Sequence, residues 1–390
     1  MADTIDLKPN PKILEWARQR SGVSREAIIK KWSKYEQWLD GTKTPTVKQI
    51  RDFADKVHIN VPDLYLDEIP NLELQIADFR TGSDKKVVTP SPELYDTINL
   101  MISRQQWMRE YFIHEGREKI SFVGSFTGKP LDNATKDELV NSIYALLNLN
   151  DAWATKEQDV RSALKTLKDA IERVGVSVEI NGIVGNNTHR PLNEYEFRGF
   201  ALSDDYAPLI FVNGKDNKTA QMFTLIHELC HLAFSETGVS NPLDDESVNS
   251  VSENFCNKVA ADFLVPTKTL CNSWNSENSK NNYKKICALA RKCKVNFIVV
   301  ARKVKDEGLI DSSTFYKLYH TYKTNVPVEG KNEQKSGGNY YRNMQYKLGN
   351  VFGDAIWTAA NTDFISFRDA YALSDMKGAS FMKYFEGQAC

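Results

Sequence analysis

The spacing of apolar positions predicts a mixture of helices and short strands. Apolar residues recur at helical spacing in residues 163–174, and the run 176–180 that follows is typical of a strand. Residues 221–226 and 253–265 again show helical spacing, and Pro266 ends the second of these runs because proline cannot continue a helix. Helices and strands that follow one another in this way predict an α+β fold for the central part of the chain.

The first of these central helices carries an H-E-x-x-H motif, formed by His227, Glu228 and His231. Residues four apart lie on one face of a helix, so the two histidines can bind one metal ion while Glu228 lies beside them as a general base. With six histidines in 390 residues, a chance match is expected only about 0.006 times per chain. The motif therefore indicates a zinc peptidase.

A catalytic zinc ion takes three protein ligands, so the motif needs a third donor. Phe234 and Thr237 stand where a metzincin has glycine and histidine, which excludes that class. We predict Glu253 as the third ligand, and Asn257, one turn later, as an acceptor for the second N–H of a ligating histidine. The alternative ligands are the acidic residues between the two helices: Asp244, Asp245 and Glu246.

Around these positions the chain resembles the ImmA/IrrE family of metallopeptidases. Residues 223–232 are similar to the family pattern F-T-x-x-H-E-x-x-H, and residues 253–266 to E-x-x-A-N-x-F-A-A-x-L-L-x-P. Cys256 and Val259 replace the usual alanine and phenylalanine, which are mild changes in packing. The resemblance extends over most of the chain from about residue 76 to about residue 311.

The resemblance implies a zincin-like catalytic domain with a Zn²⁺ cofactor. It implies that zinc is held by His227, His231 and Glu253 while Glu228 activates the attacking water. Residues 198–202 and 210–213 look like the paired strands that lead into the family's active-site helix. The sequence does not single out an oxyanion donor, for which the candidates are His189, Tyr195, Arg198 and His320.

The N-terminal region is similar to the phage-repressor type of helix-turn-helix domain that often precedes this family's catalytic domain. Helices are expected after Pro11 and through residues 44–54. The 14 positions from Ser24 to Trp38 are about three fewer than usual, which leaves no glycine turn before a recognition helix. This shortening favours a protein-docking or structural role over the reading of DNA.

These observations predict five segments along the chain. They are a degenerate helix-turn-helix-like domain (1–68), a connecting segment with a long helix (69–125), an ImmA/IrrE-like zinc metallopeptidase domain (126–325), a linker (326–339) and a C-terminal helical module (340–390). The linker is rich in lysine, glutamine, serine and glycine.

Charge and cysteine content narrow the functional classes. The formal net charge of -1 gives no overall field that would attract nucleic acid, so any DNA contact must be local. We expect neither a secretion signal at the N-terminus nor a membrane span, because no run approaches roughly 18 apolar residues. The six cysteines form no C-x-x-C pair. These features predict a cytosolic protein without disulfides.

The sequence thus predicts a zinc endopeptidase that cleaves a specific regulatory protein, such as a transcriptional repressor or an operon-encoded partner. One alternative is a non-proteolytic regulator that binds a partner through the same fold. A second is a DNA-binding autorepressor with a structural zinc site. The presence of Glu228 favours the enzyme, because a structural zinc site has no use for a general base.

Overall fold

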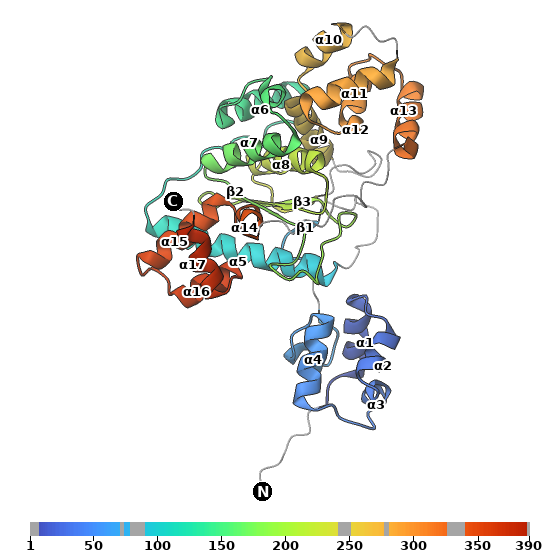
Figure 1. The fold of residues 1–390 in the computed structure, drawn as a ribbon, viewed down its shortest axis with the longest axis vertical. Helices are drawn as coiled ribbons and strands as arrows, with labels where there is room; N and C mark the ends of the chain where they lie inside the picture. Colours follow the sequence, from blue (N-terminus) through green and yellow to red (C-terminus); the bar gives the residue numbers. More distant parts are fainter. Residues whose placement is uncertain are drawn as a thin grey trace. The chain divides into compact units, whose positions relative to one another are not determined.

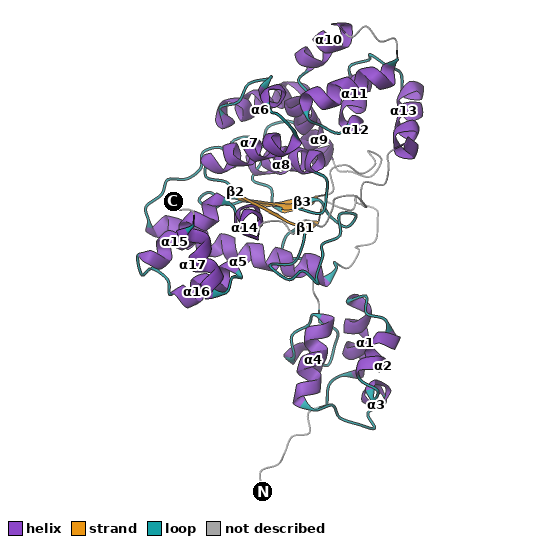
Figure 2. Ribbon diagram, in the orientation of Figure 1, coloured by secondary structure: helices purple, strands orange, loops and turns teal. Residues whose placement is uncertain are grey.

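A computed structural model describes residues 8–70, 74–78, 90–240, 251–276, 281–325 and 340–387. The chain divides into two compact units, residues 1–75 with 88–98, and residues 76–87 with 99–390 (Figure 1). Helices and strands follow one another in the second unit, which confirms the α+β class (Figure 2). Within the described ranges, no helix has the length and apolar character needed to cross a bilayer.

The first unit is a small helical bundle. Its helices are α1 (Pro11–Arg20), α2 (Arg25–Lys31), α3 (Tyr35–Leu39) and α4 (Val47–Val57), with a 3-10 turn at Pro62–Tyr65. Stacked and edge-on aromatic rings form its core, with Tyr35 and Phe53 5.7 Å apart between ring centroids. Helix α3, which lies in the shortened region, has five residues. The preference for a docking or structural role over the reading of DNA stays a prediction.

The second unit is built on a mixed sheet, which has five strands among the described residues, in the order β1-β5-β3-β4-β2. The strands are β1 (Ala77–Asp78), β2 (Ser177–Asn181), β3 (Gly199–Leu202), β4 (Leu209–Asn213) and β5 (Gly238–Ser240). Strand β3 is antiparallel to β4 and β5, whereas β2 is parallel to β4 and β1 is parallel to β5. The predicted paired strands before the active-site helix, β3 and β4, are therefore confirmed.

Four helices cover one face of this sheet (Figure 1). They are α6 (Asn133–Leu147), α7 (Val160–Arg173), α8 (Lys218–Ala233) and α9 (Val251–Leu264). Helix α8 is buried from Ala220 to Ala233, since it packs against β3 and β4 on one side and against α7 and α9 on others. A helix enclosed on all sides is expected to be apolar around its whole circumference except at functional positions. Because α8 is enclosed in this way, the polar residues of the H-E-x-x-H motif lie inside the protein.

The opposite face of the sheet is covered by α5 and by the C-terminal helices (Figure 1). These are α5 (Pro92–His114), α14 (Tyr340–Leu348), α15 (Asn350–Asn361), α16 (Phe367–Ser374) and α17 (Gly378–Glu386). Helices α14 and α15 pack on β2, so the C-terminal helices share the sheet with the central region. The predicted linker at 326–339 lies outside the described residues, and the five-segment division stays a prediction.

The remaining helices follow α9 in the chain. They are α10 (Thr267–Ser276), α11 (Asn282–Cys293), α12 (Phe297–Asp306) and α13 (Ser312–Asn325), and a 3-10 turn at Trp153–Lys156 contacts α11. A left-handed Lys294, with φ of 57°, ends α11 and separates it from α12. The basic stretch from residue 283 to residue 310 thus forms two helices with an apolar inner face, part of the main core.

Candidate metal centre

Helices α8 and α9 pack side by side and bring three potential ligands together. The Nε2 atoms of His227 and His231 are 3.1 Å apart, and they lie 3.2 and 3.1 Å from the two carboxylate oxygens of Glu253. All three residues are 0–1% exposed. Among the described residues, these three form the one cluster of histidine, cysteine, aspartate and glutamate side chains that could hold a metal ion.

The chemistry of the three donors fits a zinc ion. Ligands bound at 2.0–2.2 Å in a tetrahedral arrangement lie about 3.3 Å from one another, close to the separations found here. Imidazole nitrogens and a carboxylate present lone pairs toward a common point, and a buried cluster of lone pairs is stabilised by a cation at that point. A set of three protein donors matches a catalytic rather than a structural zinc site.

Glu228 lies next to this cluster and is completely buried. Its Oε1 atom accepts a hydrogen bond from the hydroxyl of Ser240 on β5, while Oε2 has no hydrogen-bond partner among the described residues. Burial raises the pKa of the Glu228 carboxyl, although the neighbouring histidines oppose this effect. One carboxylate oxygen is thus held in place and the other is available to accept a proton.

A glycine on β3 permits the close approach of the sheet to Glu228. A Cβ atom at Gly199 would lie 2.5 Å from Cγ2 of Thr224, 2.8 Å from the carbonyl oxygen of Phe211 and 3.2 Å from Oε1 of Glu228. The carbonyl oxygen belongs to the backbone of β4, so it cannot move aside as a flexible side chain could. Gly199 therefore allows the sheet to lie this close to α8.

The ionisation of Glu253 suits a metal ligand. Burial acts to raise its pKa, but the adjacent histidines, His227 foremost, outweigh this effect and lower the pKa to about 2. The carboxylate is therefore ionised at neutral pH. The alternative ligands Asp244, Asp245 and Glu246 lie outside the described residues.

Hydrogen bonds around His231 involve residues that the sequence did not single out. Its Nδ1 atom lies 2.7 Å from Oε2 of Glu236, which in turn accepts hydrogen bonds from the hydroxyl of Ser252. The predicted acceptor, Asn257, has no hydrogen-bond partner for its Oδ1 atom among the described residues, so its role stays a prediction. An acidic residue in the turn directly after H-E-x-x-H is the signal that could have identified Glu236.

The four candidate oxyanion donors do not join the donor cluster. Arg198 forms an ion pair with Asp216. Tyr195 is 81% exposed, and His189 and His320 are exposed as well. An oxyanion donor therefore stays unassigned among these four residues.

Cys256 stands beside the centre without being a suitable ligand. Its Sγ atom lies 3.8 Å from Nδ1 of His231, on the ring edge remote from Nε2. Burial raises the pKa of this thiol well above its ordinary value, so it stays protonated, whereas metal ligation requires a thiolate. The five cysteines within the described ranges are all free.

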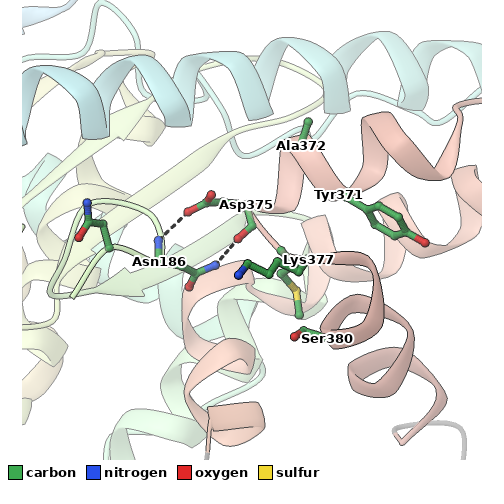
Figure 3. Close-up of a pocket in the computed structure, with 8 residues that line it drawn as sticks. Asn186, Tyr371, Ala372, Asp375, Lys377 and Ser380 are labelled. Atoms are coloured by element: carbon green, nitrogen blue, oxygen red, sulfur yellow. Dashed lines mark hydrogen bonds between the residues drawn. The ribbon is translucent and has the colours of Figure 1, made fainter. Parts of the chain in front are cut away.

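A separate cavity of about 490 Å³ lies between the connection from β2 to β3 and the C-terminal helices (Figure 3). It is lined by Asn186, Asn187, Tyr371, Ala372, Asp375, Met376, Lys377 and Ser380. The backbone N–H of Asn186 donates to Asp375 Oδ2 at 2.6 Å, and the Asn186 amide donates to the Asp375 carbonyl at 2.5 Å. Because these polar groups are hydrogen-bonded to one another, we interpret the cavity as the place where two segments of the chain meet and not as the candidate active site.

Comparison with known proteins supports this location of the site. Residues 171–305 match the family model described as the IrrE N-terminal-like domain, a peptidase family, and this range includes β2 to β5 and α8 to α11. A search of the curated proteins finds no significant match to the chain. The matched family and the cluster of two histidines and a glutamate together support a zincin-like metallopeptidase domain with a potential metal site.

Proposed function

We propose that this protein is a zinc-dependent endopeptidase that cleaves a specific regulatory protein, such as a transcriptional repressor or a partner encoded beside it. The observation that carries the proposal is the convergence of His227, His231 and Glu253 on one point, with the buried Glu228 beside it. Three ligands and an adjacent carboxylate are what metal-assisted peptide hydrolysis requires.

Each residue has a distinct role in this proposal. His227, His231 and Glu253 hold the metal ion, which when bound would polarise the scissile carbonyl and favour ionisation of water. Glu228 takes the proton of the attacking water at Oε2 and passes it to the leaving amine. Ser240 holds Oε1 of the same carboxylate, so the proton-accepting oxygen keeps one orientation.

A regulatory peptidase needs a narrow choice of substrate. The helices that flank the sheet offer binding area away from the scissile bond, and binding energy gained there can be used for selection of one partner. The helical bundle in the first unit is a further candidate for docking such a protein. A cytosolic location and the identity of the substrate remain predictions from the sequence.

The proposal is tested by comparing newly formed protein N-termini in cells that carry the wild-type protein or Glu228→Gln, after a stress such as DNA damage. Glu228→Gln should retain the metal yet lower the cleavage rate about 10²–10⁴-fold, because the amide cannot accept the proton. Glu110→Gln, an exposed change on α5, serves as the control.

A protein terminus that appears with the wild type and the control but not with Glu228→Gln would identify the substrate. A purified Glu228→Gln protein that cleaves this substrate at the wild-type rate would contradict the general-base role. If no terminus depends on Glu228 while Glu228→Gln still sustains the biological phenotype, the protein acts by binding a partner rather than by proteolysis.

A further inference from the structure

We propose that Glu236 is a positioning residue for the metal ligand His231, an inference that rests on the proposed metal-dependent function. The Oε2 atom of Glu236 lies 2.7 Å from Nδ1 of His231, while Nε2 of the same ring faces Glu253 and His227. An ionised carboxylate can only accept, so the hydrogen lies on Nδ1 and the lone pair on Nε2. This is the tautomer that a metal ion needs.

The hydrogen bond also restrains the orientation of the ring. A histidine side chain can rotate about two bonds, and each rotation moves Nε2 away from the point shared with His227 and Glu253. A fixed acceptor at Nδ1 restricts both rotations and increases the basicity of the ligand. Glu236 would therefore contribute to metal affinity without contacting the metal.

The backbone places Glu236 for this contact. The residue lies in the turn after α8, where its N–H donates to the carbonyl oxygen of His231 at 2.9 Å. Ser235, with φ of 60°, reverses the chain so that the side chain at position 236 returns to the His231 ring. The contact is therefore determined by the end of the same helix that carries the ligand.

A second contact connects Glu236 to α9. The hydroxyl of Ser252 lies 3.1 and 2.9 Å from the two carboxylate oxygens of Glu236. Ser252 immediately precedes Glu253, the ligand that α9 supplies. One carboxylate thus contacts a ligand on α8 and the residue beside a ligand on α9.

A second group near Nδ1 of His231 is a weaker acceptor. Cys256 lies 3.8 Å away, and its sulfur is a poor acceptor. The Glu236 side chain is 33% exposed, so it avoids most of the cost of burying a charge while water weakens the bond only in part. We therefore expect an effect of the size known for residues that support metal-bound histidines rather than that of a ligand.

The experiment measures the affinity of the full chain for Zn²⁺ by competition with a chelator, together with the absorption spectrum of the Co²⁺ form. Glu236→Ala should weaken Zn²⁺ binding about 10–100-fold and alter the Co²⁺ spectrum. Glu236→Gln should recover part of the affinity, because its amide oxygen still accepts from Nδ1–H. Glu110→Ala, an exposed change on α5, should leave the affinity unchanged.

Ser252→Ala distinguishes positioning of the ring from a simple connection between the helices. This change removes the contact with α9 and keeps the acceptor for His231, so it should weaken binding less than Glu236→Ala does. Equal losses for Ser252→Ala and Glu236→Ala, without recovery by Glu236→Gln, would contradict the proposal. Should Glu236→Ala fail to fold, the comparison of Glu236→Gln with Ser252→Ala decides.

The outcomes separate this inference from the proposed function. Wild-type affinity in Glu236→Ala would overturn the positioning role and leave the peptidase function intact. A protein that binds Zn²⁺ with the predicted order of affinities yet cleaves no protein would overturn the peptidase function alone. A wild-type chain that binds no Zn²⁺ would overturn both.

Discussion

Two groups of buried carboxylates differ in what surrounds them. In one group, Glu179 pairs with Arg104 and Glu172 pairs with Lys168. In the other, Glu253 contacts the two imidazoles of the candidate metal centre and Glu228 contacts a serine hydroxyl. In the first group, basic side chains of the same chain neutralise the carboxylates.

The paired group holds the C-terminal helices to the sheet. Arg104 on α5 reaches Glu179 on β2 and also donates to the carbonyl oxygen of Leu373, 3.0 Å away at the end of α16. Glu172 accepts from the backbone N–H and the amide of Asn350 at the start of α15, both at 2.7 Å. These carboxylates thus connect helices that are far apart in the sequence.

A buried carboxylate with a structural role differs from those of the candidate metal centre in what compensates its charge. A buried charge is costly unless an opposite charge and hydrogen bonds compensate it. Glu179 and Glu172 receive that compensation from arginine and lysine. The cluster of His227, His231 and Glu253 instead brings its donor atoms to a common point, where a bound metal ion would supply the positive charge.

The largest effect is expected from breaking the ion pair beneath the sheet. Arg104→Met should destabilise the protein by about 3–5 kcal/mol at pH 8, because Glu179 would remain buried without its partner. Urea denaturation of the full chain measures this change. Arg104→Met/Glu179→Leu should recover most of the loss, since it removes both charges; a double variant as unstable as the single one would mean that packing rather than charge dominates.

A smaller effect is expected at the candidate metal centre, where the measured quantity is the affinity for Zn²⁺. Glu253→Ala should weaken Zn²⁺ binding by more than about 100-fold, the upper end of what loss of a supporting residue costs, because it removes a ligand itself. Metal content after dialysis against a mild chelator reports the change, with Glu228→Gln as the variant that keeps all three ligands. Unchanged zinc content in Glu253→Ala would place the third ligand elsewhere.

The smallest effect concerns pH. Burial, only partly offset by Arg104, raises the pKa of Glu179 to about 7. The folded chain therefore binds more protons than the unfolded chain between the ordinary glutamate pKa of about 4.3 and pH 7, and stability falls as pH rises through this window, by at most about 1.4 kcal/mol per pH unit. Glu179→Gln removes the titrating group, so its stability relative to the wild type should rise from pH 5 to pH 7. A constant difference between the two proteins would contradict the raised pKa.

The sequence was most informative where chemistry and helical periodicity coincide. His227, Glu228 and His231 lie within five residues of one helix, so their common face followed from the helical repeat alone. The strands before that helix and the α+β class were likewise predicted correctly. The placement of Glu253 beside the histidines agrees with its prediction as a ligand, but its role awaits the affinity measurement.

The supporting residues were not predicted, because their contacts depend on how the chain turns after α8. Glu236 reaches His231 only through the left-handed Ser235, and Ser240 reaches Glu228 only because β5 pairs with β3. The need for glycine at position 199 likewise arises only in the folded structure, where the sheet lies close to Thr224. Periodicity describes neighbours within one element and carries no information on such contacts between elements.

By itself, the sequence determined which side chains lie together on one helix, since the H-E-x-x-H spacing places two imidazoles on one face with a carboxylate beside them. Only the tertiary structure decided which further residues surround these side chains and how the carboxylates elsewhere are neutralised. Ser240, Glu236 and the Arg104–Glu179 pair act across elements that are distant in sequence. The physical reason is that local spacing follows from backbone geometry, whereas compensation of buried charge depends on the packing of the whole unit.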